Sequence, residues 1–93
     1  MQIDLDKQKV VRNEKAIELT GKEFRLLCLL AKSPGHIFSK TMLLDQVWDM
    51  NYFPESNVVE VTIANLRAKL ERQGKPLIHS RRGVGYWLGE EDA

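Results

Sequence analysis

The stretch NVVEVTIANLRAKLE, residues 57–71, decides the fold that we expect for this chain. At 100° per residue, a helix from about Val58 to Arg72 gathers its large apolar side chains into one stripe, formed by Val59, Ile63, Leu66 and Leu70. The opposite side holds the small or uncharged residues Val61, Ala64, Asn65 and Ala68. A solvated helix would carry Glu and Lys there, so this outer face favours close approach to a flat or concave partner.

Two further helices are expected before it. Thr20 and Glu23 form a capping box that begins a helix, and Pro34-Gly35 ends it. Its apolar face contains Phe24, Leu27, Cys28 and Ala31, with Leu30 beside them. Ser39 caps a second helix in KTMLLDQVWDM, residues 40–50, whose buried side contains Leu43, Leu44, Val47 and Trp48. An aromatic loop, NYFPESN, residues 51–57, separates the second helix from the third.

The rest of the chain has strand patterns. Residues 3–19 predict short antiparallel strands with a turn at Asn13-Glu14, and HIF, residues 36–38, could be a very short strand. LIHS (77–80) and YWL (86–88) form a hairpin through RRGVG, with Arg81 and Arg82 at or near its tip. Either Tyr86 or Trp87 should pack inward. We expect one α+β domain over residues 1–93, because 43% hydrophobic content in 93 residues supplies one core, with residues 89–93 as a frayed tail.

The charge is unevenly distributed. The net charge is +1, but residues 57–89 carry six basic and two acidic residues. Such a segment suits a polyanionic partner, although solvated helix charge gives the same count. Helices followed by a basic hairpin describe a winged helix-turn-helix, whose leading helix can enter the major groove of duplex DNA.

Individual residues then acquire possible roles. Asn65 can pair with adenine N6 and N7, and Val61 or Ala64 can touch a thymine methyl, although a solvent-facing amide is the simpler reading of Asn65 alone. Arg82 is the candidate for the minor groove, while Arg81 meets a phosphate or solvent. Thr62, Arg67 and Lys69 are placed to reach phosphates.

Other classes of function find little support. His36 and His79 lie at no metal-binding spacing from each other or from Cys28, and Gly83-Val84-Gly85 is a turn and not a nucleotide-binding loop, so we expect no enzyme, metal or cofactor. We expect Cys28 to be a buried thiol. A single cysteine without a disulfide partner is consistent with a reducing compartment. No apolar run approaches the roughly 20 residues of a membrane span, so we expect a cytoplasmic protein without membrane contact.

Four motifs together resemble the OmpR/PhoB-type winged-helix effector domain of bacterial two-component response regulators. They are LTGKEFRLLCLL, GHIFSKTMLLDQVW, NVVEVTIANLRAKLE and IHSRRGVGYWL, and the likeness covers residues 2–88. The resemblance implies an N-terminal four-stranded antiparallel sheet, three helices, a C-terminal β-hairpin wing, and head-to-tail binding to tandem DNA half-sites by a protein that is monomeric when free.

The resemblance also implies site residues. Major-groove readers would be Val58, Val61 and Asn65, and the wing residue would be Arg82. DNA backbone contacts would come from Ser39, Lys40, Trp48, Thr62, Arg67 and Ser80. The charge and position of Lys69 and Arg81 place these two residues in the same group. The loop where family members meet RNA polymerase subunits corresponds to Asp49, Met50, Asn51, Tyr52, Phe53, Pro54 and Glu55.

Some features depart from the family pattern. Ala64, Asn65 and Asn57 stand where many members have arginine, which implies fewer phosphate contacts and a shallower salt dependence. The receiver domain through which a sensor histidine kinase would act is missing from these residues, and we expect an excised effector domain. The competing interpretation is a winged helix that binds protein through the 49–57 loop and the outer helix face.

Overall fold

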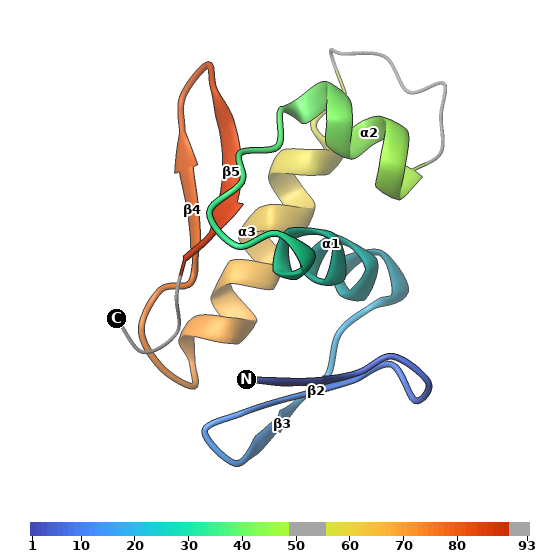
Figure 1. Ribbon diagram of the computed structural model, residues 1–93, viewed down its shortest axis with the longest axis vertical. Helices are drawn as coiled ribbons and strands as arrows, with labels where there is room; N and C mark the ends of the chain where they lie inside the picture. The colour runs from blue at the N-terminus through green and yellow to red at the C-terminus, as the bar shows by residue number, and fades with distance from the viewer. Residues whose placement is uncertain (49–55, 90–93) are drawn as a thin grey trace.

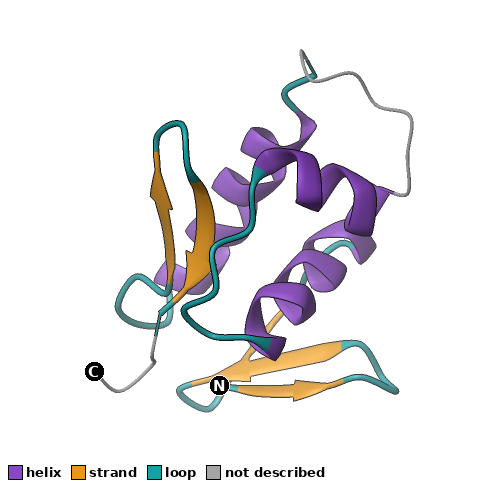
Figure 2. Cartoon of the chain, turned by 45° about the horizontal axis from the view of Figure 1, so that its top comes forward, coloured by secondary structure: helices purple, strands orange, loops and turns teal. Residues whose placement is uncertain are grey.

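The computed structural model describes residues 1–48 and 56–89. Figures 1 and 2 show an α+β arrangement in which the helices lie between a small N-terminal sheet and a C-terminal hairpin, which confirms the expected fold class. In chain order the elements are β1 (Gln2–Asp4), β2 (Lys9–Arg12), β3 (Lys15–Ile17), α1 (Gly21–Lys32), α2 (Lys40–Trp48), α3 (Val58–Glu71), β4 (Ile78–Arg81) and β5 (Gly85–Leu88).

The N-terminal sheet has three strands in the order β1-β2-β3, so the expectation of four was wrong. Asn13 and Glu14, with φ of 52° and 66°, form the predicted turn between β2 and β3. Residues 5–8 form the other turn, and β3 ends at Ile17, so that Glu18 and Leu19 alone separate the sheet from the cap of α1. The chain therefore has no residues left at this point for a fourth strand.

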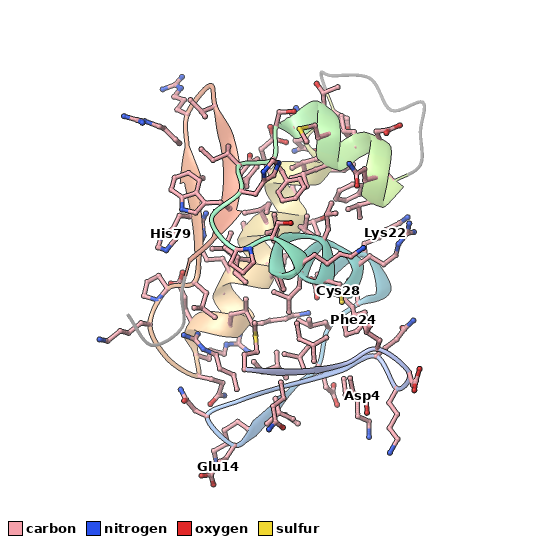
Figure 3. All side chains as sticks on the ribbon, in the orientation of Figure 1. Asp4, Glu14, Lys22, Phe24, Cys28 and His79 are labelled. Carbon is pink, nitrogen blue, oxygen red and sulfur yellow. The ribbon has the colours of Figure 1, made fainter. Side chains whose placement is uncertain are left out.

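Helix α1 begins at the predicted capping box. The Glu23 amide donates to Thr20 Oγ1 at 3.2 Å, and the Thr20 amide donates to Glu23 Oε1 at 2.9 Å. The buried side consists of Phe24, Leu26, Leu27 and Leu30, together with the Glu23 carboxylate. Cys28 is only half-buried, contrary to expectation, because it lies on the side of α1 that faces the N-terminal sheet (Figure 3) and lines an open 590 Å³ cavity there.

Helices α2 and α3 bury the faces that the sequence predicts. Ser39 caps α2 by accepting a hydrogen bond from the Met42 amide at 3.1 Å. The predicted apolar sides are buried in both helices: Leu43, Leu44, Val47 and Trp48 in α2, and Val59, Ile63, Leu66 and Leu70 in α3. Packing of α3 against both other helices leaves its opposite face outward.

Strands β4 and β5 form the predicted hairpin, called the wing below, from Ile78 paired with Leu88 to Arg81 paired with Gly85. The predicted HIF strand is reduced to one bridge, in which Phe38 and Tyr86 exchange backbone hydrogen bonds of 2.8 and 2.9 Å. Gly85, at φ +153°, permits this approach, because a Cβ there would collide with the Phe38 carbonyl oxygen. The wing is thus hydrogen-bonded to the segment that leads into α2.

A buried arginine joins the N-terminal sheet to the end of α3. Arg12 of β2 is 2% exposed, and its guanidinium donates to the Leu70 carbonyl at 2.6 Å and the Lys75 carbonyl at 2.5 Å. The Asn13 side-chain amide donates to the carbonyl of Gln73 in the same loop. The last carbonyls of a helix have no partner within the helix. The Leu70 carbonyl accepts from the Gln73 amide at 3.1 Å, and Arg12 supplies a further, charged donor from a different part of the chain.

Candidate nucleic-acid interface

The outer face of α3 is exposed and nearly uncharged, as the sequence predicts. Val61, Ala64, Asn65 and Ala68 are all exposed, and Val61 retains 47% of its accessible surface. These residues lie opposite the buried stripe, so the face contains one amide, one branched aliphatic side chain and two methyl groups. Its low relief allows the helix axis to come close to another surface, and Asn65 can both donate and accept hydrogen bonds.

Each edge of this face carries a basic residue that contacts another element. Arg67, on the edge towards the wing, donates through Nη2 to Ser80 Oγ of β4 at 3.3 Å. Lys69, on the opposite edge, places its Nζ 2.6 Å from Glu23 Oε1 of α1. Both cations were predicted to contact phosphates. The structure orients both through protein contacts, and Lys69 shares its charge with a carboxylate.

The Lys69 contact also alters the acidity of Glu23. Burial raises the pKa of Glu23, but the hydrogen bonds from Lys69 and Thr20 and the positive charge of Lys69 outweigh it, so the pKa lies below its ordinary value. The Glu23 carboxylate, which caps α1, thus also forms an ion pair with Lys69 of α3.

A cleft of 550 Å³ lies where the wing, the beginning of α2 and the beginning of α3 meet. Figure 1 shows these three parts at the same end of the molecule, opposite the N-terminal sheet. The cleft is lined by three basic side chains, four hydroxyl-bearing residues, one carboxylate and three residues at the tip of the wing: Lys40, Arg81, Arg82, Ser39, Thr41, Ser80, Tyr86, Glu60, Gly83, Val84 and Gly85. This composition suits an anionic partner.

The wing presents its arginines outward from a fixed base. Arg81 is the last residue of β4 and Arg82 begins the turn, and both are exposed. Tyr86 packs against the core, which confirms that one of the two aromatic residues faces inward. Trp87 instead lies beside His79, with ring centroids 5.8 Å apart, and Figure 3 shows His79 on the outer side of the hairpin.

The pKa of the Tyr86 hydroxyl reflects its burial and the charges around it. Burial raises the pKa of Tyr86, and the negative charge of Glu60 raises it further, while the positive charges of Lys40 and Arg67 lower it. The phenol therefore stays protonated at neutral pH and can donate a hydrogen bond.

The remaining predicted residues are distributed between this region and the core. Ser39, Lys40 and Ser80 lie in the cleft, and Val58 and Thr62 are half-buried on α3. Trp48 is 8% exposed and belongs to the core. The loop residues Asp49–Glu55, expected to meet RNA polymerase, lie outside the described residues, as do residues 90–93 of the expected tail. Gly89, the first residue of that expected tail, donates a hydrogen bond from its amide to the Leu77 carbonyl at 2.7 Å.

The sequence interpretation missed Glu60 as a member of the cleft. Its Oε2 lies 3.0 Å from Nζ of Lys40, which belongs to another helix. The predicted DNA contacts are cations, amides, hydroxyls and apolar side chains, so an acid is not among them. The signal that could have found it is its helical angle, since Glu60 shares an edge of α3 with Arg67, seven residues later.

Within residues 1–48 and 56–89 there is no group of three or more His, Cys, Asp or Glu side chains close enough to hold a metal ion. Over the same residues, none of the helices has the length and apolar character needed to span a bilayer.

Comparison with known proteins identifies the family. A family model described as "Transcriptional regulatory protein, C terminal" matches residues 13–88. The transcriptional activator protein IrlR of Burkholderia pseudomallei is 42% identical over 89 residues, which are 95% of this chain and 39% of IrlR. The chain thus spans about two fifths of the length of the curated relatives that it matches.

Solved structures agree with this result. The DNA-binding domain of CpxR from Escherichia coli superimposes with a TM-score of 0.84 and 32% identity, covering 96% of this chain and 89% of that one. The Klebsiella pneumoniae RstA DNA-binding domain in complex with RstA box gives a TM-score of 0.83 at 27% identity, covering 94% and 88%. The chain therefore belongs to the OmpR/PhoB-type family of response-regulator DNA-binding domains, which are transcriptional regulatory domains and not enzymes.

Proposed function

We propose that this chain binds duplex DNA in a sequence-specific manner, with the outer face of α3 in the major groove and the wing at the adjoining minor groove. The observation that carries the proposal is the position of the uncharged α3 face beside a cleft lined by Lys40, Arg81 and Arg82. A low-relief helix can approach base edges, while the cations beside it neutralise phosphates. RstA, a relative of known structure, was solved with its RstA box.

In this proposal base edges are read by the exposed part of α3. Asn65 pairs with adenine through N6 and N7, and Val61 contacts a thymine methyl group. Val58, half-buried at the start of the helix, contributes apolar contact. Because this set contains one hydrogen-bonding side chain, we expect much of the discrimination to follow from Asn65.

The wing and the edges of α3 contact the DNA backbone. Arg82 enters the minor groove, where narrow A·T-rich segments attract a guanidinium. The proposed phosphate contacts are Ser39, Lys40, Trp48, Thr62, Arg67, Lys69, Ser80 and Arg81. Trp48 could take part only through the small exposed part of its side chain. Lys69 should contribute less than Arg81, because its ammonium is shared with Glu23.

The proposal extends to the larger protein that the relatives represent. Two domains would bind tandem half-sites head to tail and remain separate without DNA. A receiver domain would connect the chain to a sensor histidine kinase, and residues 49–55 would meet an RNA polymerase subunit. These assignments rest on membership of the family and on the two-fifths share of the relatives' length.

The test is selection of bound duplexes from a random pool, followed by titration of the selected duplex and a scrambled one. Asn65→Ala and Arg82→Ala should each weaken binding to the selected duplex by roughly 1–3 kcal/mol. Arg81→Ala should weaken binding to both duplexes alike and reduce the salt slope by about 0.9.

The matched control is Lys7→Ala, which removes one positive charge from the exposed turn between β1 and β2. It should leave the affinity for both duplexes unchanged. If no duplex is enriched, or if Arg82→Ala and Asn65→Ala bind as the unmodified chain does, the groove assignments are wrong. A protein partner that binds the unmodified chain and the Arg82→Ala variant equally well would instead support the protein-binding module.

A further inference from the structure

The cleft that we assign to the DNA backbone contains an acid, Glu60, in the first turn of α3. Its carboxylate lies 3.0 Å from the Lys40 ammonium at the start of α2, with the two side chains 47% and 29% exposed. Arg81, Arg82 and Lys40 all belong to the same cleft. A negative charge here opposes the binding of a polyanion, so its presence calls for a physical reason.

Stability alone is a weak reason for the pair. An ion pair between partly exposed side chains contributes little to folding, since solvent screens it and both side chains lose conformational freedom. An acid in the first turn of a helix does gain from the helix dipole. That gain requires an acid near the N-terminus of α3, but it does not require a lysine from another helix to lie against it.

A reason appears when the pair is considered beside DNA. Lys40 is one of the cations of the cleft, and Glu60 holds its ammonium at the boundary between α2 and α3. A phosphate that approaches Lys40 must share that cation with the carboxylate, and it is repelled by the carboxylate itself. A complex that depends on phosphate contacts alone therefore bears the full repulsion.

A complex with α3 seated in the major groove differs in one respect. Glu60 occupies the edge of the outer face, next in sequence to the exposed Val61, so seating the helix moves its carboxylate towards base edges. Base edges there offer hydrogen-bond donors, among them the cytosine N4 amino group, from which a Glu carboxylate can accept a hydrogen bond. The repulsion is then offset at a matching site and not elsewhere.

We propose that Glu60 is a specificity-determining residue, whose carboxylate holds Lys40 and lowers affinity for non-matching duplexes more than for the matching site. The inference rests on the proposed DNA binding. It assigns to one carboxylate the suppression of binding that depends only on the phosphate backbone.

The experiment compares Glu60→Gln with Glu71→Gln in the full chain, on the selected duplex and on a scrambled duplex of equal length. Glu71 is exposed at the last position of α3, and its replacement removes the same charge from the same helix. It lies about 16 Å along the helix from Glu60. This exceeds the Debye length of about 8 Å at physiological salt, so its long-range effect is screened.

Glu60→Gln should tighten binding to the scrambled duplex by about three- to tenfold, as expected for removal of one nearby like charge. Binding to the selected duplex should change by less than about twofold, so the ratio of the two affinities falls. The salt slope on the scrambled duplex should steepen by about 0.9, because Lys40 then neutralises a phosphate without competition from the Glu60 carboxylate. Glu71→Gln should leave both affinities and the slope unchanged.

A double-mutant cycle with Lys40→Gln tests whether Glu60 acts through Lys40. The Glu60→Gln effect on the scrambled duplex should shrink when Lys40 is absent. Equal effects of Glu60→Gln and Glu71→Gln, or an equal change on both duplexes, would overturn the inference and leave the proposed function intact. If the unmodified chain binds no duplex, the proposed function fails and this inference fails with it.

Discussion

Replacing Arg12 with methionine tests whether the buried guanidinium maintains the end of α3. In the native chain it donates to the Leu70 carbonyl at 2.6 Å and to the Lys75 carbonyl at 2.5 Å. Hydrogen bonds from a charged donor contribute about 1.5–3 kcal/mol each. Methionine fills much of the same volume, so the loss should come from the carbonyls and not from a cavity.

The two carbonyls should contribute unequally. The Leu70 hydrogen bond is buried, so its carbonyl loses the charged donor without gaining water and keeps the 3.1 Å hydrogen bond from the Gln73 amide, whereas the Lys75 hydrogen bond is part-buried and water can replace it. Part of the gain is also offset by the cost of burying a charged guanidinium. We therefore expect Arg12→Met to lower the free energy of unfolding by about 3 kcal/mol, out of the roughly 5–15 kcal/mol typical of a domain.

Thermal and urea unfolding followed by circular dichroism measure this change. A loss of about 3 kcal/mol should lower Tm by roughly 12–24 °C in a domain of this size. Arg12→Lys, which keeps the charge but cannot span both carbonyls, should lose about half as much. Arg25→Met is the control, because Arg25 is exposed and makes one 3.4 Å hydrogen bond to the Gln46 carbonyl. If Arg12→Met lowers Tm no more than Arg25→Met does, the assigned role of Arg12 is wrong.

Three further predictions concern other parts of the fold. Glu23→Gln should destabilise the chain at pH 7, because a carboxylate with a lowered pKa stabilises the fold while it is ionised. The difference in unfolding free energy between the variant and the unmodified chain should vanish as the pH falls through the lowered pKa of Glu23. Urea unfolding from pH 7 to pH 3 measures this difference. Gly85→Ala should cost about 2 kcal/mol in the same assay, since a Cβ there displaces Phe38, whereas Gly21→Ala, with open space around it, should be neutral or stabilising. Cys28 should react with a thiol reagent more slowly in the folded chain than in guanidinium, because burial raises its pKa despite the charge of a nearby lysine, and equal rates would contradict this.

The features that the sequence predicts well depend on residues close together in the chain. The Thr20–Glu23 capping box, the buried stripe of α3 and the turn at Asn13-Glu14 each involve residues within a few positions or at a fixed helical period. Backbone geometry relates such residues directly, so their spacing is enough to predict the contact. The exposed face of α3 followed from the same periodicity.

The features that the sequence does not predict join distant segments. Arg12 stands between Val11 and Asn13 in a short strand, where a charged residue is normally read as exposed, and its partners lie 58 and 63 residues away. The Lys69–Glu23 and Lys40–Glu60 pairs each connect two helices, and no periodicity within one helix reveals them. The fourth N-terminal strand was carried over from the family resemblance, and the cap at Thr20 comes too soon after β3 to allow it.

The bridge between Phe38 and Tyr86 has a consequence for how the chain folds during synthesis. The Gly35 amide also donates to the Leu88 carbonyl, so the segment before α2 is paired at two places with the last strand of the hairpin. A ribosome must release residues 85–88 before either contact can form. Until then, residues 35–38 present unpaired backbone groups while α1 is already complete. We expect a nascent chain stalled before Gly85 to expose this segment to proteases, and completion of the last strand to protect both ends of the contact in a single step.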